Sequence, residues 1–332
     1  MVDRRQKHPV GGVDYPRTLS EFLEFFPDEG ACFAYLERLR WAEGFVCPKG
    51  HTAEAPWRSS RGLAICPTCR QQTSVTAGTT FQGTRKLYQW FLAAWEVTSH
   101  KPGASALGIQ QTLGLGSYKT AWAWLHKLRR AMVRPGRDRL NGRIEVDETL
   151  VGGIEDGAYG RGTATKSLVV IATEVRGTGI GRIRLRCIER ADAATLHLFL
   201  TDCVEPGSVV ITDGWSGYSE LSQLGYKHER HIISGSGRKA HELLPRVHRV
   251  ASLIKRWLLG THQGGVTREH IEFYLDEFTF RFNRRTSKAR GLLFYRLLEQ
   301  AVNTPHMPMQ NLFRETGRGP RRKPLKIKGS EN

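Results

Sequence analysis

Two short cysteine motifs near the N-terminus constrain the fold of this chain more than any other feature. Cys66 and Cys69 form the knuckle "CPTC", and Cys47 opens "CPKGH", which ends at His51. Thiolate and imidazole suit tetrahedral zinc, and four protein ligands predict a closed structural site. His51 then replaces the second cysteine of the first knuckle. We predict a structural zinc ribbon with ligands Cys47, His51, Cys66 and Cys69; the alternative is a loop with free thiols.

The segment around these motifs, residues 43–82, has short hydrophobic runs and frequent Cys, Gly, Pro and Thr. It is too poor in apolar residues to fold alone, so bound metal would have to supply its folding energy.

The charge balance favours an anionic polymer as partner. The chain has 332 residues, with 50 Lys plus Arg against 32 Asp plus Glu, and its formal net charge is +18 at pH 7. Neutralised phosphates release counterions, which strengthens binding of such a chain to nucleic acid. The alternative is a soluble basic surface without a partner.

The chain also lacks the signals of a membrane or exported protein. No run approaches the roughly 20 apolar residues that a membrane helix needs, and "MVDRRQKHPV" lacks the apolar core of a signal peptide. We expect a cytoplasmic, nucleoid-associated protein, in which disulfides are unexpected and paired cysteines indicate metal.

The hydrophobic pattern predicts a multidomain α+β protein. Residues 84–134 have helical periodicity, and residues 143–213 alternate as strands do, with three strands followed by a helix and another strand. The predicted parts are an N-terminal arm (1–25), a zinc ribbon with a preceding helix (26–82), a helical DNA-binding segment (83–140), a mixed α/β core (141–288), and a C-terminal helix with a basic tail (289–332).

The stretch "GASALGIQQTLGLGSYKTAWAWLHKLRRAM" has the pattern of a helix-turn-helix. Two helical stretches meet at "GLG", and Ser117 is a good N-cap for the second. That helix could enter a major groove, or the pair could be an ordinary helical hairpin. Its candidate DNA-binding residues are Lys119, Lys127, Arg129 and Arg130.

Two aspartates lie in the predicted strands of the core. Asp147 lies in "RIEVDETLVGG", and Asp213 ends the apolar run "VVITD". If these strands are neighbours, both carboxylates reach one metal. Oxygen ligands favour Mg²⁺ or Mn²⁺, and such ions serve phosphodiester chemistry.

Several motifs together resemble the bacterial insertion-sequence DDE transposases that carry an N-terminal zinc ribbon. The front half contributes "CPTCRQQTSVTAGTTFQGT" and "GLGSYKTAWAWLHKLRRAM", and the core contributes "TDGWSGY", "HRVASLIKRWLLGTHQG" and "YLDEFTFRFNRR". The similarity runs from about residue 28 to 300. It implies a ribonuclease H-like catalytic core, divalent metal, and endonuclease and strand-transfer chemistry on DNA.

The resemblance also assigns roles to individual residues. Asp147 and Asp213 correspond to the first two catalytic acids. The third position, normally Glu or Asn, stands seven residues before a lysine, which is Lys255 here, and His248 occupies it. His248 could ligate a metal, but it brings no negative charge and suits magnesium poorly. Glu242 could act instead, and His248 could also be structural.

Further basic and aromatic residues accompany this group. Lys255 would contact a DNA phosphate. Arg284 and Arg285 could follow the DNA backbone or cap a helix. Trp215 could pack beside the site or stack on a base, and Glu148 should point to the opposite sheet face.

The predicted function is DNA transposition, that is, recombination at the ends of an insertion sequence. The partners are double-stranded DNA of the terminal inverted repeats and of the target, with at least a homodimer in the DNA complex. The alternative is a non-catalytic DNA-binding regulator or an inactive transposase remnant.

Overall fold

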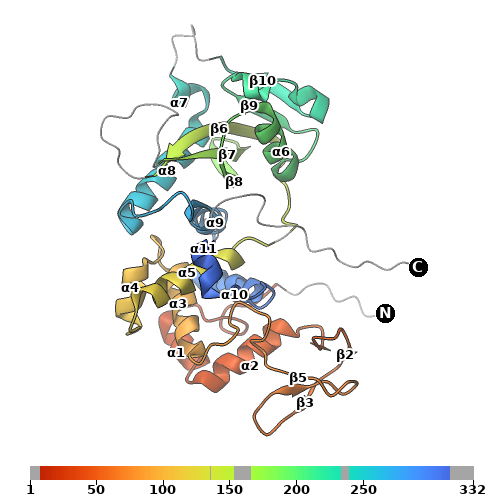
Figure 1. Ribbon diagram of the computed structural model, residues 1–332. Helices are drawn as coiled ribbons and strands as arrows, with labels where there is room; N and C mark the ends of the chain where they lie inside the picture. Colours follow the sequence, from red (N-terminus) through yellow and green to blue (C-terminus); the bar gives the residue numbers. More distant parts are fainter. Residues whose placement is uncertain (1–7, 135, 153–165, 233–238, 315–332) are drawn as a thin grey trace, which may run out of the picture. The chain divides into compact units, whose positions relative to one another are not determined.

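The computed structural model describes residues 8–134, 136–152, 166–232 and 239–314, which form two compact units. The first unit combines residues 8–133 with residues 287–314, and the second begins at Arg134 and ends at Thr286 (Figure 1). Within these described ranges, no helix is long and apolar enough to cross a membrane.

The first unit is mainly helical. Its helices are α1 (Leu19–Phe25), α2 (Glu29–Arg40), α3 (Leu87–Ser99), α4 (Ala106–Thr112), α5 (Tyr118–Ala131), α10 (Arg290–Ala301) and α11 (Met309–Arg314). The side chain of Thr18 caps α1, and that of Asp28 caps α2. The segment 1–25 therefore differs from the expected arm, because its last part forms α1 and buries Phe22.

An aromatic cluster closes this helical unit with a residue from the far end of the chain. Phe294 of α10 is fully buried, and its ring centroid lies 5.6 Å from Phe22, 5.8 Å from Phe26, 5.8 Å from Phe91 and 5.6 Å from Trp95. Helix α10 thus belongs to the N-terminal unit, whereas the sequence pattern placed it with the basic tail. The predicted tail itself, residues 315–332, lies outside the described residues.

The ribbon of the first unit contains only very short strands. β1 (Phe45–Val46) pairs with β2 (Thr52–Ala53), and β4 (Ala64–Ile65) lies between β3 (Trp57–Arg58) and β5 (Gln72–Thr73). Its buried cluster consists of two apolar residues, Phe45 and Ala64, and two cysteines, Cys47 and Cys66. So small a core agrees with a segment that needs metal to fold.

The second unit is built on a five-stranded mixed sheet with the order β10-β9-β6-β7-β8. β6 pairs antiparallel with β7, and β7 with β8, while β9 and β10 run parallel to β6. This is the ribonuclease H-like arrangement that the sequence predicts. The strands are β6 (Arg143–Val151), β7 (Ser167–Arg176), β8 (Gly179–Ile188), β9 (Val209–Thr212) and β10 (Lys227–Arg230).

Helices cover both faces of this sheet (Figure 1). One face packs against α8 (Pro245–His262) and α9 (Ile271–Phe282), and the other against α6 (Ala193–Cys203). The remaining elements are the short helices η1 (Ser216–Tyr218), η2 (Leu221–Leu224) and α7 (Ala240–Leu243). Because successive side chains alternate between faces, β6 directs Ile144 and Val146 to the α6 face and Glu145 to α8.

Candidate active site and metal centre

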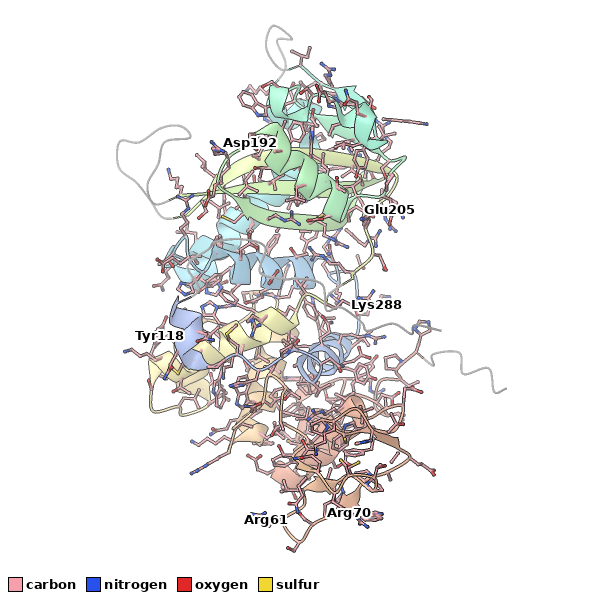
Figure 2. The ribbon with its side chains drawn as sticks, turned by 45° about the vertical axis from the view of Figure 1, so that its right-hand side comes forward. Arg61, Arg70, Tyr118, Asp192, Glu205 and Lys288 are labelled. Carbon is pink, nitrogen blue, oxygen red and sulfur yellow. The ribbon has the colours of Figure 1, made fainter. Side chains whose placement is uncertain are left out.

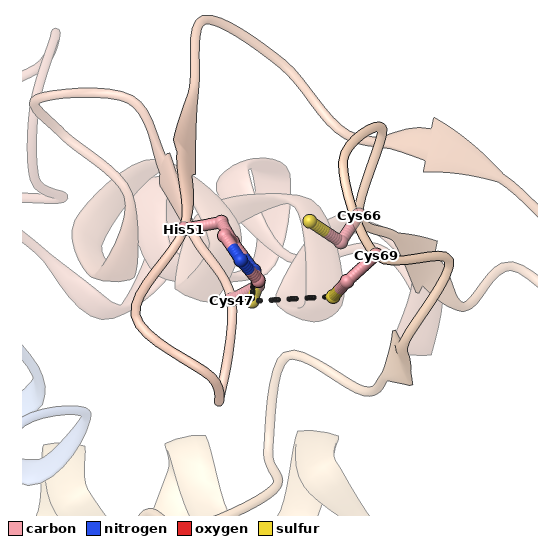
Figure 3. A group of neighbouring side chains, drawn as sticks. All are labelled: Cys47, His51, Cys66 and Cys69. Carbon is pink, nitrogen blue, oxygen red and sulfur yellow. Dashed lines mark hydrogen bonds between the residues drawn. The ribbon is translucent and has the colours of Figure 1, made fainter.

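The four predicted zinc ligands meet in the ribbon (Figure 3). Cys47 Sγ lies 3.3 Å from His51 Nδ1 and 3.9 Å from Cys69 Sγ. The ligand atoms of these three residues and of Cys66 all lie within 4.8 Å of one another. No other group of three or more such side chains within the described residues meets this criterion. Three thiolates and one imidazole are a ligand set for structural zinc.

Two tight turns create this cluster. In the first, the N–H of Cys47 donates to the carbonyl of His51, and Gly50, with φ +87°, donates to the carbonyl of Cys47. In the second, Arg70, with φ +59°, donates to the carbonyl of Cys66. The first turn places His51 beside Cys47, where a second cysteine would supply the ligand in a Cys-x2-Cys knuckle.

The surroundings of the Cys66 thiol lower its pKa. Its burial opposes ionisation, but hydrogen bonds from the backbone N–H groups of Cys69 and Thr68 lower the pKa of Cys66 to about 7. A thiolate is the form that binds metal.

Sheet pairing makes the strands that lead to Asp147 and Asp213 neighbours in the second unit. Glu145 of β6 pairs with Ile211 of the parallel strand β9. Two residues further along the chain come Asp147, which is still in β6, and Asp213, which is one residue past the end of β9. The charges of both act on the buried hydroxyl of Tyr218. Asp213 Oδ1 accepts from the N–H of Trp215 at 3.0 Å, and Gly214, with φ +85°, turns the chain away after the strand.

Helix α8 adds His248 to this pair. His248 Nε2 lies 3.4 Å from Asp147 Oδ2, although it has no hydrogen-bond partner of acceptable geometry among the described residues. Burial, followed by the charge of His241, lowers the pKa of His248, while Glu145 and Asp213 oppose that shift. The imidazole is therefore neutral at pH 7.

Glu145 fixes the start of α8. Its carboxylate accepts from the N–H of Arg246 at 2.7 Å and of Val247 at 2.9 Å, and it pairs with the Arg246 guanidinium at 2.9 Å. Glu145 is only 2% exposed. Glu145 was not among the residues predicted from the sequence, although the spacing Glu145-x-Asp147 already places both acids on one face of a strand.

On the opposite face, Glu148 accepts a hydrogen bond from the hydroxyl of Tyr218, as its predicted orientation requires. Tyr218 is fully buried. Burial, then the charges of Glu148, Asp147 and Asp213, raise the pKa of Tyr218 well above its ordinary value. Both candidate catalytic acids therefore act electrostatically on the same buried hydroxyl.

The other predicted residues of this site have distinct positions. Glu242 accepts from the N–H of Lys239 at the start of the short helix α7 and is exposed. Lys255 lies two turns beyond His248 on α8. Although Lys255 is exposed overall, partial desolvation and then Lys166 lower its pKa, and Asp147 partly offsets that effect.

The predicted helix-turn-helix corresponds to α4 and α5, but its basic residues differ in accessibility. Lys119 is exposed in the first turn of α5, which begins at Tyr118 (Figure 2). Lys127 is half-buried, and burial, followed by Arg130, lowers its pKa. Arg129 is only 1% exposed, and its Nη1 lies 3.4 Å from His126 Nδ1. Arg129 is therefore not accessible in this structure, whereas Lys119 is exposed, and the DNA contacts of both stay predictions.

Arg284 and Arg285 follow the second of the two predicted alternatives. Arg284 donates to the carbonyl of Phe280, and Arg285 donates to the carbonyls of Phe282 and Gly181. Both cap the C-terminal end of α9, where cations are favourable.

Two family models match the chain. An ISXO2-like transposase domain matches residues 139–283, and a transposase zinc-ribbon domain matches residues 27–89. An uncharacterized transposase-like protein of Haemophilus influenzae is 27% identical over 115 residues, which are 35% of this chain and 92% of that protein.

The chain is also similar to solved Mos1 complexes at a low level. A pre-cleavage Mos1 transpososome is 10% identical, with 69% of this chain and 79% of that chain covered and a TM-score of 0.29. A Mos1 transposase paired-end complex with left transposon end is 12% identical, with 86% and 90% covered and a TM-score of 0.30. These scores are too low to carry an argument, so the fold assignment rests on strand order and on the two family matches.

The family matches agree with the structure in order and in extent. The zinc-ribbon match contains the four-ligand cluster, and the transposase-domain match contains the whole mixed sheet with α8 and α9. Together they cover well over half of the chain, which combines a transposase zinc-ribbon domain with an ISXO2-like transposase domain.

Proposed function

We propose that this protein cleaves and joins DNA at the ends of an insertion sequence, with Asp147, Asp213 and His248 as the catalytic group. One observation carries the proposal. The parallel strands β6 and β9 pair as far as two residues before Asp147 and Asp213, and His248 Nε2 of α8 lies 3.4 Å from Asp147 Oδ2. A rigid sheet and a capped helix are the supports that a catalytic constellation requires.

The side chains fit a divalent ion. Asp147 and Asp213 offer carboxylate oxygens, which suit Mg²⁺ or Mn²⁺. His248 offers a buried nitrogen that lacks a hydrogen-bond partner in the described part of the chain, and its lowered pKa keeps the ring neutral. When bound, such ions activate the attacking oxygen and stabilise the leaving oxygen of a phosphodiester.

The remaining residues would position the DNA. The charge of Asp147 raises the pKa of Lys255, so the two side chains are close enough to interact. Lys255 is also exposed, so its ammonium can bind a phosphate next to Asp147. Lys119 can contact a duplex from the first turn of α5. The net charge of +18 supplies a general attraction to DNA.

A nicking assay tests the proposal. The substrate is a duplex that contains the terminal inverted repeat, with Mg²⁺ or Mn²⁺ added. Asp147→Asn and Asp213→Asn should each reduce cleavage by at least about 1,000-fold, because each replaces a charged carboxylate ligand with a neutral amide, and should keep duplex binding. Asp202→Asn is a matched control, because Asp202 is an exposed acid of α6 that pairs with Arg186. Undiminished cleavage by either site variant would refute the assignment.

A second candidate function is that of a DNA-binding regulator without catalysis. The observation in its favour is the neutral His248, which lowers the negative charge of the site relative to a three-acid group. His248→Glu separates the two functions. A catalytic protein should nick the duplex and respond to this change, whereas a regulator would bind the duplex and nick it in neither form.

A further inference from the structure

A cavity of about 580 Å³ opens in the second unit. Its apolar wall is formed by Leu150 of β6, Leu168 of β7 and Ile188 of β8. Trp215, which follows Asp213 by two residues, also lines it. The volume is in the range of small-ligand sites, and none of the residues proposed for catalysis is part of its lining.

Trp215 links this cavity to the acid pair. Its indole Nε1 donates to the carbonyl of Ala191 at 2.8 Å, which fixes the plane of the ring. Its backbone N–H donates to Asp213 Oδ1 at 3.0 Å. Two hydrogen bonds, from the indole Nε1 and from the backbone N–H, thus fix the position of Trp215. The residue is nevertheless 39% exposed, so its ring can contact a ligand.

The charged part of the lining favours an anion. Among the described residues of the lining, Lys166, Arg190 and Arg268 contribute three cations, against two acids, Glu189 and Asp192. Asp192 caps α6 through the N–H of Thr195 and pairs with Arg190 Nε at 3.3 Å, which leaves Lys166 and Arg268 against Glu189 (Figure 2). The Arg190 side chain is 83% exposed. The cavity therefore suits a flat apolar group that carries a negative charge.

We propose that this cavity holds one unpaired nucleotide of the bound DNA, next to the phosphate that reacts at Asp147 and Asp213. The inference rests on the proposed function. The base lies against Trp215 and the aliphatic wall, and its phosphate pairs with Arg190 or Arg268. A base inside a duplex is stacked on both faces, so only an unpaired or extruded base can offer its face to Trp215.

Binding measurements on the full-length chain test this proposal without any cleavage step. Fluorescence anisotropy compares a blunt duplex with the same duplex carrying a two-nucleotide 3′ or 5′ overhang, in EDTA-free buffer without added divalent ions. One overhang polarity should bind roughly tenfold tighter than the blunt end, because base stacking on an aromatic ring has that order of effect. The preferred polarity identifies the strand that enters the cavity.

Three variants and one modified DNA make the test specific. Trp215→Ala should abolish the overhang preference and leave blunt-duplex affinity unchanged, whereas Trp215→Phe should keep most of it. Arg268→Ala should weaken overhang binding a few-fold. Trp57→Ala is the matched control, because Trp57 is 47% exposed in the zinc ribbon and should keep the preference. An overhang of abasic sugar-phosphates should bind like the blunt end.

Three results would contradict a nucleotide in this cavity. The proposal is overturned if neither overhang is preferred, if the abasic overhang binds as tightly as the normal one, or if Trp215→Ala keeps the preference. Should Trp215→Ala prove unfolded by circular dichroism, unaltered overhang binding by both Trp215→Phe and Arg268→Ala overturns it. Failure to bind any duplex would instead contradict the proposed function itself.

Discussion

The two groups of candidate metal ligands in this protein are built in opposite ways. In the ribbon, Cys47, His51, Cys66 and Cys69 come from two neighbouring turns, and all four ligand atoms lie within 4.8 Å of one another. In the sheet unit, Asp147, Asp213 and His248 come from β6, from the end of β9 and from α8, which are far apart in the sequence.

This difference follows from what holds each region together. The buried cluster of the ribbon has four residues, and two of them, Cys47 and Cys66, are also predicted zinc ligands. The core of the ribbon therefore depends on the same residues as its metal site. The sheet has apolar layers on both faces, so its shape does not depend on its acids. A metal that folds a domain must be held tightly, whereas an ion that serves a reaction needs an open site on a preformed support.

Removal of zinc should have the largest effect, and only in the ribbon. We expect a strong zinc chelator, or the change Cys66→Ser, to unfold residues 43–82, because bound metal supplies their folding energy. Hydrogen exchange read by mass spectrometry should show full exposure of these amides and unchanged protection of β6 to β9. Loss of protection in the sheet would break the comparison. Metal analysis of the native protein should give about one zinc per chain.

A second test concerns His51, the predicted fourth zinc ligand of the ribbon. His51→Ala should weaken zinc binding by at least about 100-fold, because even supporting residues of metal sites have effects of 10- to 100-fold. His51→Cys should retain zinc, since it supplies a thiolate at the position that lies 3.3 Å from Cys47 Sγ. Competition with a chromophoric chelator measures both affinities. Equal zinc affinity of His51→Ala and the native protein would remove His51 from the ligand set.

The sheet site should instead be sensitive to a residue that binds no metal. Glu145→Gln should lower the free energy of unfolding of the sheet unit by about 3 kcal/mol, because it leaves the buried end of α8 and Arg246 without their charged partner. It should also reduce cleavage, since α8 carries His248. The control is Glu229→Gln, which removes the more exposed pair of Glu229 with Arg143 and should cost less than about 1 kcal/mol. Equal destabilisation by the two changes, measured by urea unfolding, would contradict a special role for Glu145.

A smaller effect should appear as pH dependence of the sheet unit. Burial opposes ionisation of Glu174, but hydrogen bonds from Arg182 outweigh burial and lower the pKa of Glu174 below its ordinary 4.5. The stabilisation is therefore complete above about pH 4.5 and is lost as the pH falls through the lowered pKa. Glu174→Gln should cost about 2 kcal/mol at pH 7, and the difference from the native protein should shrink toward pH 3. A difference that stays constant across this range would show that the charge of Glu174 contributes nothing.

Local sequence patterns were sufficient for much of the molecule. The spacing of the cysteines with His51 predicted the ribbon ligands, because ligands within one turn of the chain have little freedom in where they lie. Alternating hydrophobicity predicted the strands and placed Asp147 and Glu148 on opposite faces. Residue types alone could not tell whether Arg129 or Lys119 is accessible, because accessibility depends on which face of α5 is packed.

The sequence by itself determined the ligand set of the ribbon, the strand carrying Asp147 and the strand end carrying Asp213, since each depends on residues a few positions apart. Only the tertiary structure decided that β6 and β9 are neighbours, that Glu145 anchors α8 so that His248 faces Asp147, and that Phe294 packs among N-terminal helices. These contacts join residues tens or hundreds of positions apart. Their free energy comes from burial and pairing that exist only once the whole unit has folded.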